Sequence, residues 1–201
     1  MQSTSSKTCR EIWDEMNILL SERKFIRNFS CCISMDCNGN DSETAKSYTI
    51  ETDLFPVEAL RVYSAYNLGE DIEEAERSRY FSAHRGGSQG DYREGIKEKI
   101  SNVVDCLKQF PASKRAVITI PNNSFASHKS DDYAKCMREM HFYIDGNVLN
   151  ATVWMRAQAA EIFPKNIHFI GSLMHKIACA LDLKVGELFY LATNLVSVRM
   201  D

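Results

Sequence analysis

The 201-residue chain has 44% hydrophobic and 25% charged residues and a formal net charge of -3. This composition is ordinary for a folded protein, and the length favours a single domain over residues 1–201 with a sizeable core. The slight negative charge argues against a nucleic-acid-binding scaffold, which needs a basic surface to neutralise phosphates. A small anionic ligand, in contrast, needs only a few well-placed arginines.

Residues 1–13 lack the basic and apolar regions of a signal peptide, and no apolar run is long enough to span a bilayer. We therefore expect a cytoplasmic protein that does not bind membranes. The seven cysteines form no Cys-x-x-Cys pair and their number is odd, which argues against a disulfide scaffold. Cys31, Cys32 and Cys37 form the closest group, but no histidines stand at ligand spacing, so we expect reduced thiols and no metal.

Hydrophobic periodicity predicts the elements in chain order. The predicted helices cover residues 7–20, 56–66, 70–79, 91–109 and 167–181, and the predicted strands cover residues 25–35, 116–120, 141–144, 149–154 and 187–198. Ser6 or Thr8 is the expected cap of the first helix. The turn Asp145-Gly146-Asn147 joins two strands into a hairpin, because Asp-Gly supplies the positive φ of a tight turn. A further turn is expected over 182–186.

Helices and strands do not alternate strictly along the chain. Strict alternation is the signature of a doubly wound parallel sheet, whereas separate runs of strands and helices favour the α+β class. The sequence therefore predicts an α+β fold.

A candidate site lies in residues 135–181. Cys136 enters the first hairpin strand, Arg156 leaves the second, and Asn166 stands at the start of a helix. Arginine binds phosphate bidentately, and a nearby arginine lowers the pKa of a thiol toward the reactive thiolate. A buried, inert cysteine is the alternative. Lys114 and Arg115, at a strand entrance, suit phosphate too, although a solvated pair is the commoner explanation.

The order of these features resembles the thymidylate synthase family. Five segments carry the resemblance. Residues 80–85 resemble the family's Tyr-Gly-x-x-Trp-Arg, and residues 106–115 resemble its Leu-Ile-Lys-x-x-Pro-x-Ser-Arg-Arg. Residues 155–157 stand where the family has Gln-Arg-Ser, residues 164–166 where it has Pro-Phe-Asn, and residues 181–187 where it has Leu-x-Val-Gly-Asp. Cys136 stands at the position of the nucleophilic cysteine. The similarity covers roughly residues 80–190, and a weaker similarity is found at residues 57–60. Residues 1–50 form a divergent N-terminal part.

The resemblance implies a mixed β-sheet packed with helices, with the sheet used for dimerisation. It implies a folate-dependent C5 methyl- or hydroxymethyltransferase that acts on a pyrimidine nucleotide monophosphate. The expected cofactor is 5,10-methylenetetrahydrofolate, and the expected assembly is a homodimer or a heterodimer with a homologue. Cys136 would add to C6 of the base, and Glu58 would organise proton transfer through water.

The substrate-binding residues follow from the same motifs. Arg156 would hold the 5'-phosphate together with Arg115 and Lys114, which the partner subunit would donate. Asn166 would hydrogen-bond the base edge, and Arg85, in the segment 80–85, would be a further substrate-binding residue.

Several positions depart from the family pattern. Met155 and Ala157 replace the glutamine and serine of Gln-Arg-Ser, and residues 192–198 lack the histidine and tyrosine of the family's Gly-Gly-Asp-x-His-x-Tyr. Each lost hydrogen bond would cost about 0.5 to 1.5 kcal/mol. The alternative function is therefore a non-catalytic nucleotide-binding or partner subunit with a degenerate site. The chain length resembles compact members, such as archaeal thymidylate synthases and pyrimidine nucleotide hydroxymethylases.

Overall fold

The computed structural model describes residues 6–35, 46–81, 90–120 and 135–197. The helices are α1 (Cys9–Glu22), α2 (Val57–Asn67), α3 (Glu74–Tyr80), α4 (Ile96–Gln109) and α5 (Phe163–Leu181), with a short 3-10 turn over Ala160–Ile162. The strands are β1 (Phe25–Ser34), β2 (Val117–Thr119), β3 (Met137–Asp145), β4 (Val148–Met155), β5 (Gln158–Ala159) and β6 (Lys184–Val196). The predicted α+β class is confirmed.

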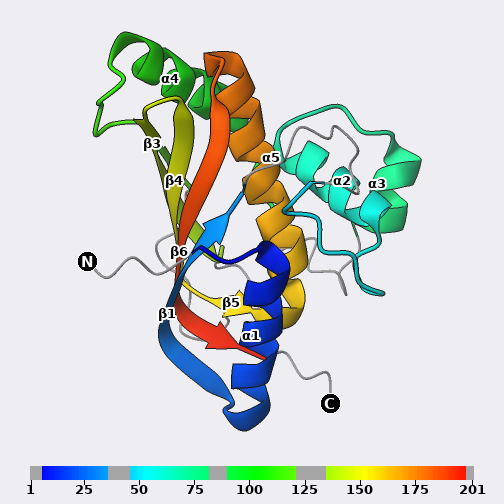
Figure 1. Ribbon diagram of the computed structural model, residues 1–201. Coiled ribbons are helices and arrows are strands. Elements are labelled where there is room, and N and C mark those ends of the chain that lie inside the picture. The colour runs from blue at the N-terminus through cyan, green and yellow to red at the C-terminus, as the bar shows by residue number, and fades with distance from the viewer. Residues whose placement is uncertain (1–5, 36–45, 82–89, 121–134, 198–201) are drawn as a thin grey trace.

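A mixed sheet forms the centre of the fold. Its strand order is β1-β6-β4-β3-β2, with β5 pairing to the end of β6. The β4–β6 pair is parallel, whereas β1–β6, β3–β4 and β2–β3 are antiparallel. Figure 1 shows α5 lying along the sheet, with α2 and α3 beyond it and α1 beside its lower half. The site described below lies where the start of α5 meets the ends of β3 and β4.

Helix α5 is apolar on nearly all sides, as a helix buried between layers must be. Its buried apolar residues are Phe163, Ile167, Phe169, Ile170, Leu173, Met174, Ile177 and Ala178. The helix ends at Asp182, which adopts the left-handed conformation (φ 55°) and so stops the chain from continuing as a helix. This packing fixes the first turn of α5 against the sheet.

Gly171 allows the Tyr48 ring to pack directly against α5. A Cβ atom there would lie 2.2 Å from Cγ of the fully buried Tyr48. Alanine favours helix by about 1 kcal/mol over glycine, but we expect Gly171→Ala to lower the free energy of unfolding by about 1 to 3 kcal/mol because of overpacking. Urea unfolding measures this change, and Ala180→Gly in the same helix is the control for propensity. A higher midpoint for Gly171→Ala would contradict the packing.

Most predicted elements are confirmed, with shifts at their ends that have local causes. Thr8 is the cap of α1 and accepts a hydrogen bond from the Glu11 N–H. Helix α4 begins at Ile96 rather than at residue 91, because Gly95 adopts φ 65° directly before it. The turn predicted over 182–186 is shorter, since β6 begins at Lys184. The short strand β5 was not predicted.

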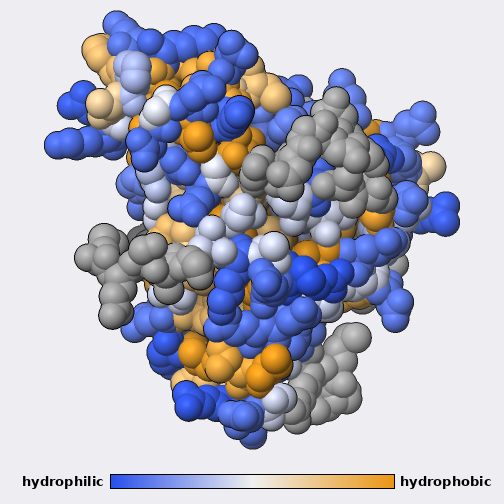
Figure 2. Space-filling model, in the orientation of Figure 1, coloured by the Kyte–Doolittle hydropathy of each residue, from blue (hydrophilic) through white to orange (hydrophobic). Residues whose placement is uncertain are grey.

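One face of the sheet carries no helix of the described chain, and large apolar side chains are exposed on it. Tyr143 on β3, Trp154 on β4 and Phe189 on β6 are each more than 40% exposed. The registers His141–Thr152 and Thr152–Phe189 place neighbouring positions of the three strands on this same face. On the other side of the molecule, Figure 2 shows apolar surface over the lower part of α1. No helix in the described ranges is long and apolar enough to cross a membrane.

Candidate functional site

The β3–β4 hairpin brings the candidate nucleophile next to the candidate phosphate ligand. Cys136 directly precedes β3, and Arg156 directly follows β4. The Arg156 backbone N–H donates a hydrogen bond to the Cys136 carbonyl oxygen over 2.7 Å. Both residues are partly buried. The structure therefore holds a thiol and a guanidinium on neighbouring residues at one end of the sheet.

Two buried tyrosines lie around this pair. Burial raises the pKa of Tyr63 and of Tyr92, and the charge of a Cys136 thiolate raises both further. The Arg156 charge acts on Tyr92 in the opposite direction. The Tyr63 hydroxyl donates a hydrogen bond to the Gly90 carbonyl oxygen over 2.8 Å. Both tyrosines are therefore neutral at ordinary pH and present rings and hydroxyl groups, not charges, to Cys136.

Lys165 is a further ionisable group that interacts with Cys136. It lies in the first turn of α5, is 2% exposed, and places Nζ 4.7 Å from the centre of the Tyr63 ring. Burial lowers the pKa of Lys165 to about 7, against the effect of a Cys136 thiolate, which raises it. Sequence reasoning missed Lys165, although a lysine at the start of a helix that is otherwise apolar was an available signal.

Asn166 is held by a network of buried amides. The Gln158 Nε2 donates to the Ala159 carbonyl oxygen over 2.6 Å, so Gln158 Oε1 is left as an acceptor. That oxygen accepts from the Tyr190 hydroxyl over 2.6 Å and from Asn166 Nδ2 over 2.9 Å. The network therefore fixes the orientation of the Asn166 amide. Asn166 Oδ1 is buried and has no hydrogen-bond partner among the described residues, which suits a ligand N–H.

Lys114 and Arg115 lie far from Cys136 within one chain. Both side chains are exposed, in a loop that lines a cavity of about 620 Å³. Val117 pairs with His141, five residues beyond Cys136 along β3, and Arg115 lies further still in the same direction. At about 3.3 Å per residue, Arg115 is separated from Cys136 by roughly 20 Å along the sheet. The chain therefore does not bring these two cations to its own Cys136.

The two remaining predicted residues are placed differently. The Glu58 side chain is exposed on α2, and the α2 side chain that faces Cys136 is Tyr63. Sequence reasoning did not select Tyr63, because this residue lies outside the motifs that were compared. Arg85 lies outside the described residues.

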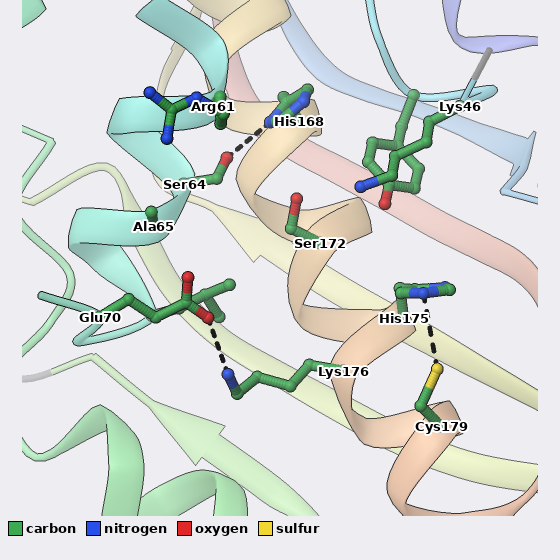
Figure 3. Close-up of a pocket in the computed structure, with 12 residues that line it drawn as sticks. Lys46, Arg61, Ser64, Ala65, Glu70, His168, Ser172, His175, Lys176 and Cys179 are labelled. Atoms are coloured by element: carbon green, nitrogen blue, oxygen red, sulfur yellow. Dashed lines mark hydrogen bonds and ion pairs between the residues drawn. The ribbon is translucent and has the colours of Figure 1, made fainter. Parts of the chain in front are cut away.

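A separate cavity of about 300 Å³ lies between α2 and α5 and includes none of the predicted site residues. Figure 3 shows the Ser64 hydroxyl of α2 directed at His168 of α5, with Ser172 and His175 further along α5 and the Arg61 guanidinium turned away from that helix. Two of its cations are paired with carboxylates, in the ion pairs Lys176–Glu70 and Arg61–Glu76. Because these carboxylates neutralise the two cations, this cavity is less suited to an anionic ligand than the Cys136 end of the sheet is.

The fold and the site together define a class: an α+β protein with a thiol, an arginine and an oriented amide at one end of a mixed sheet. The family model described as thymidylate synthase matches residues 6–196, and the chain belongs to the thymidylate synthase family. The match includes α1 and β1, where the motif comparison found nothing to align. Membership places the chain among the transferases of nucleotide biosynthesis, a family that binds pyrimidine nucleotides and generally uses methylenetetrahydrofolate.

Proposed function

We propose that the chain is a C5 methyl- or hydroxymethyltransferase that acts on a pyrimidine nucleotide monophosphate, with Cys136 as the nucleophile. The observation that carries this proposal is the hydrogen bond between the Arg156 N–H and the Cys136 carbonyl oxygen, which holds the residue that bears the guanidinium next to the residue that bears the thiol. Family membership supports the reaction class, and this backbone pairing supports the choice of Cys136 and Arg156. The free cysteines of the described chain suit a reducing compartment, so we infer a cytoplasmic enzyme.

In the proposed reaction, the Cys136 sulfur forms a bond to C6 of the base, and the displaced electron pair makes C5 nucleophilic. Arg156 binds the 5'-phosphate bidentately and, as a cation, favours the thiolate. Asn166 Oδ1 accepts an N–H of the base, in the orientation set by Gln158. Glu58, exposed on α2, keeps its proposed role in proton transfer through water, and Arg85 its proposed role as a substrate-binding residue.

Folate is the proposed one-carbon donor, and an aromatic surface next to the site suits its planar pterin ring. The rings of Tyr63 and Phe81 stack with centroids 5.6 Å apart at 18°, and Tyr66 lies against Phe81. Phe81 and Tyr66 are only partly buried, so ring surface is available. When bound, methylenetetrahydrofolate supplies the carbon unit that C5 receives.

Lys114 and Arg115 require a second subunit to reach the phosphate. We propose that two copies, or the chain and a homologue, pair through the open sheet face that carries Tyr143, Trp154 and Phe189. This pairing supports the phosphate site because the partner would bring its own Lys114–Arg115 loop across the sheet. Analytical ultracentrifugation tests the assembly directly.

The test of the function is tritium release from 5-tritiated dUMP, UMP, dCMP and CMP, with and without methylenetetrahydrofolate. Release from one nucleotide supports C5 activation and identifies the substrate. The product mass then distinguishes methyl from hydroxymethyl transfer. No release from any of the four, with folded protein in hand, would refute the proposal.

The second candidate is a non-catalytic nucleotide-binding or partner subunit. It is favoured by the loss of the Gln-Arg-Ser glutamine and serine, at Met155 and Ala157. Nucleotide binding without tritium release, or release only after a homologue is added, would support this candidate.

Gln158 provides a test of the base contact. Gln158→Met removes the acceptor that orients Asn166, so we expect about tenfold weaker nucleotide binding, the equivalent of one hydrogen bond. Equilibrium dialysis without folate measures binding alone. Tyr190→Phe is the matched control, because it removes another bond to the same oxygen and leaves the Gln158–Asn166 bond in place. Equal losses in both variants would contradict an orienting role for Gln158.

A further inference from the structure

Lys165 stands at the position where the Pro-Phe-Asn motif has phenylalanine, and its amine is enclosed. Its Nζ atom lies over the ring of Tyr63, and a Cβ atom at Gly90 would come within 2.9 Å of it. The Tyr63 hydroxyl donates to the Gly90 carbonyl, which holds this backbone segment against the lysine. The amine is therefore confined between α2, the Gly90 segment and the first turn of α5.

The groups that face this amine come from every element around it. Tyr63 lies on α2, Tyr92 follows the Gly90 segment, and Cys136 precedes β3, with Arg156 acting on Tyr92. Both tyrosines are neutral, because burial raises the pKa of each. Burial lowers the pKa of Lys165 to about 7, and Cys136 is the neighbour whose charge raises it. Burial thus brings the pKa of this amine close to neutral pH, and the charge of a Cys136 thiolate favours its protonated form.

We propose that Lys165 accepts the proton of the Cys136 thiol, so that the two residues form a lysine–cysteine pair that activates the nucleophile. This inference rests on the proposed function for its role in catalysis. The proton leaves Sγ for Nζ, and the sulfur electron pair then forms the bond to C6 of the base. When the Sγ–C6 bond breaks at the end of the reaction, its electron pair returns toward sulfur and the ammonium returns the proton. No oxidant or reductant is consumed.

The pair makes a prediction that is independent of any substrate. We expect iodoacetamide to alkylate Cys136 at pH 7 about tenfold more slowly in Lys165→Met than in the wild type, since the thiol loses its proton acceptor and less of it ionises. The rate in Lys165→Met should recover only at higher pH. Peptide mass spectrometry resolves Cys136 from the other thiols. Cys31 is the internal reference for an intact fold, because burial raises its pKa to about 12 and keeps it unreactive.

Lys165→Arg separates proton transfer from charge. Arginine keeps a positive charge near Cys136 but cannot accept a proton, because its pKa stays above 12. We expect alkylation of Cys136 in Lys165→Arg to stay within about threefold of the wild type, while tritium release falls about tenfold or more.

The outcomes distinguish this inference from the proposed function. Slow alkylation in Lys165→Met together with no tritium release in the wild type would uphold the pair and refute the transferase. Alkylation of Cys136 in Lys165→Met at the wild-type rate would overturn the pair. A loss of tritium release in both variants with no change in alkylation would also overturn it, since the lysine would then act on the substrate or the fold. The Arg variant keeps the test valid if Lys165→Met does not fold.

Discussion

Cys136→Ser is expected to lower C5 tritium release by about a thousandfold or more, with nucleotide binding nearly unchanged. A serine hydroxyl does not ionise under these conditions, and the covalent bond to C6 is the step that makes C5 reactive. Binding should persist because Arg156 and Asn166 are anchored by other contacts, to the Cys136 backbone carbonyl and to Gln158. The same tritium assay and equilibrium dialysis measure the two effects.

Cys179→Ser is the matched control for this substitution. Cys179 is exposed near the end of α5, and its Sγ lies 3.5 Å from His175 Nε2, away from the Cys136 end of the sheet. We expect release within about twofold of the wild type, the usual effect of a surface substitution. If Cys136→Ser kept more than about a tenth of the activity, the nucleophile would be another group.

The approach of Cys136 to Arg156 was predictable only in part. The Asp145-Gly146-Asn147 turn sets the hairpin, and its register continues unbroken from Asp145–Val148 to Glu139–Trp154. If that register continued, Arg156 would pair with Met137 instead of Cys136. An irregularity between Met137 and Glu139 shifts the pairing by one residue. A one-residue shift exchanges the faces of a strand, so this bulge decides which side chain accompanies the arginine, and periodicity does not reveal it.

Glu58 shows a different limit of sequence reasoning. Residues five positions apart on a helix differ by about 140° in direction, so Glu58 and Tyr63 cannot face the same neighbour. Which one faces Cys136 depends on how α2 packs against α5, and that packing buries Ala59, Leu60, Val62 and Tyr63. The motif similarity at 57–60 lies on α2, the helix that also carries Tyr63, and tertiary packing determines which face of that helix is turned toward Cys136.

Sequence reasoning did not connect Lys165 or Tyr92 with Cys136, for a related reason. Both interact electrostatically with Cys136 although their segments are far apart in the chain, and no spacing rule connects them. Asn166, by contrast, was predicted from its motif, and the structure adds Gln158, which bonds its amide, and Tyr190, which bonds the same Gln158 oxygen. Local patterns thus located the elements, while the long-range contacts determined the chemistry around the thiol.

Lys165→Met is expected to stabilise the protein at pH 6 by on the order of 5 kcal/mol, the equivalent of lowering a lysine pKa from 10.5 to about 7. Between these values the unfolded chain binds more protons than the folded one, so wild-type stability rises as the pH increases above 7. Below pH 7 both states are protonated and the full cost of burying the charge applies. The advantage of Lys165→Met should therefore shrink from pH 7 toward pH 9. Above that, the raised pKa values of Tyr63, Tyr92 and Cys31 lower stability in both proteins.

Urea unfolding at pH 6, 7, 8 and 9 measures this dependence, with Lys176→Met as the matched control. Lys176 is exposed and paired with Glu70, and exposed pairs contribute only about 0 to 1 kcal/mol. Its removal should lower stability slightly and equally at each pH in this range. A constant difference between Lys165→Met and wild type would show that the lysine keeps one protonation state throughout. A difference that falls with pH would mean that this chain gives up stability to keep a titratable amine beside Cys136, as expected of a residue retained for chemistry.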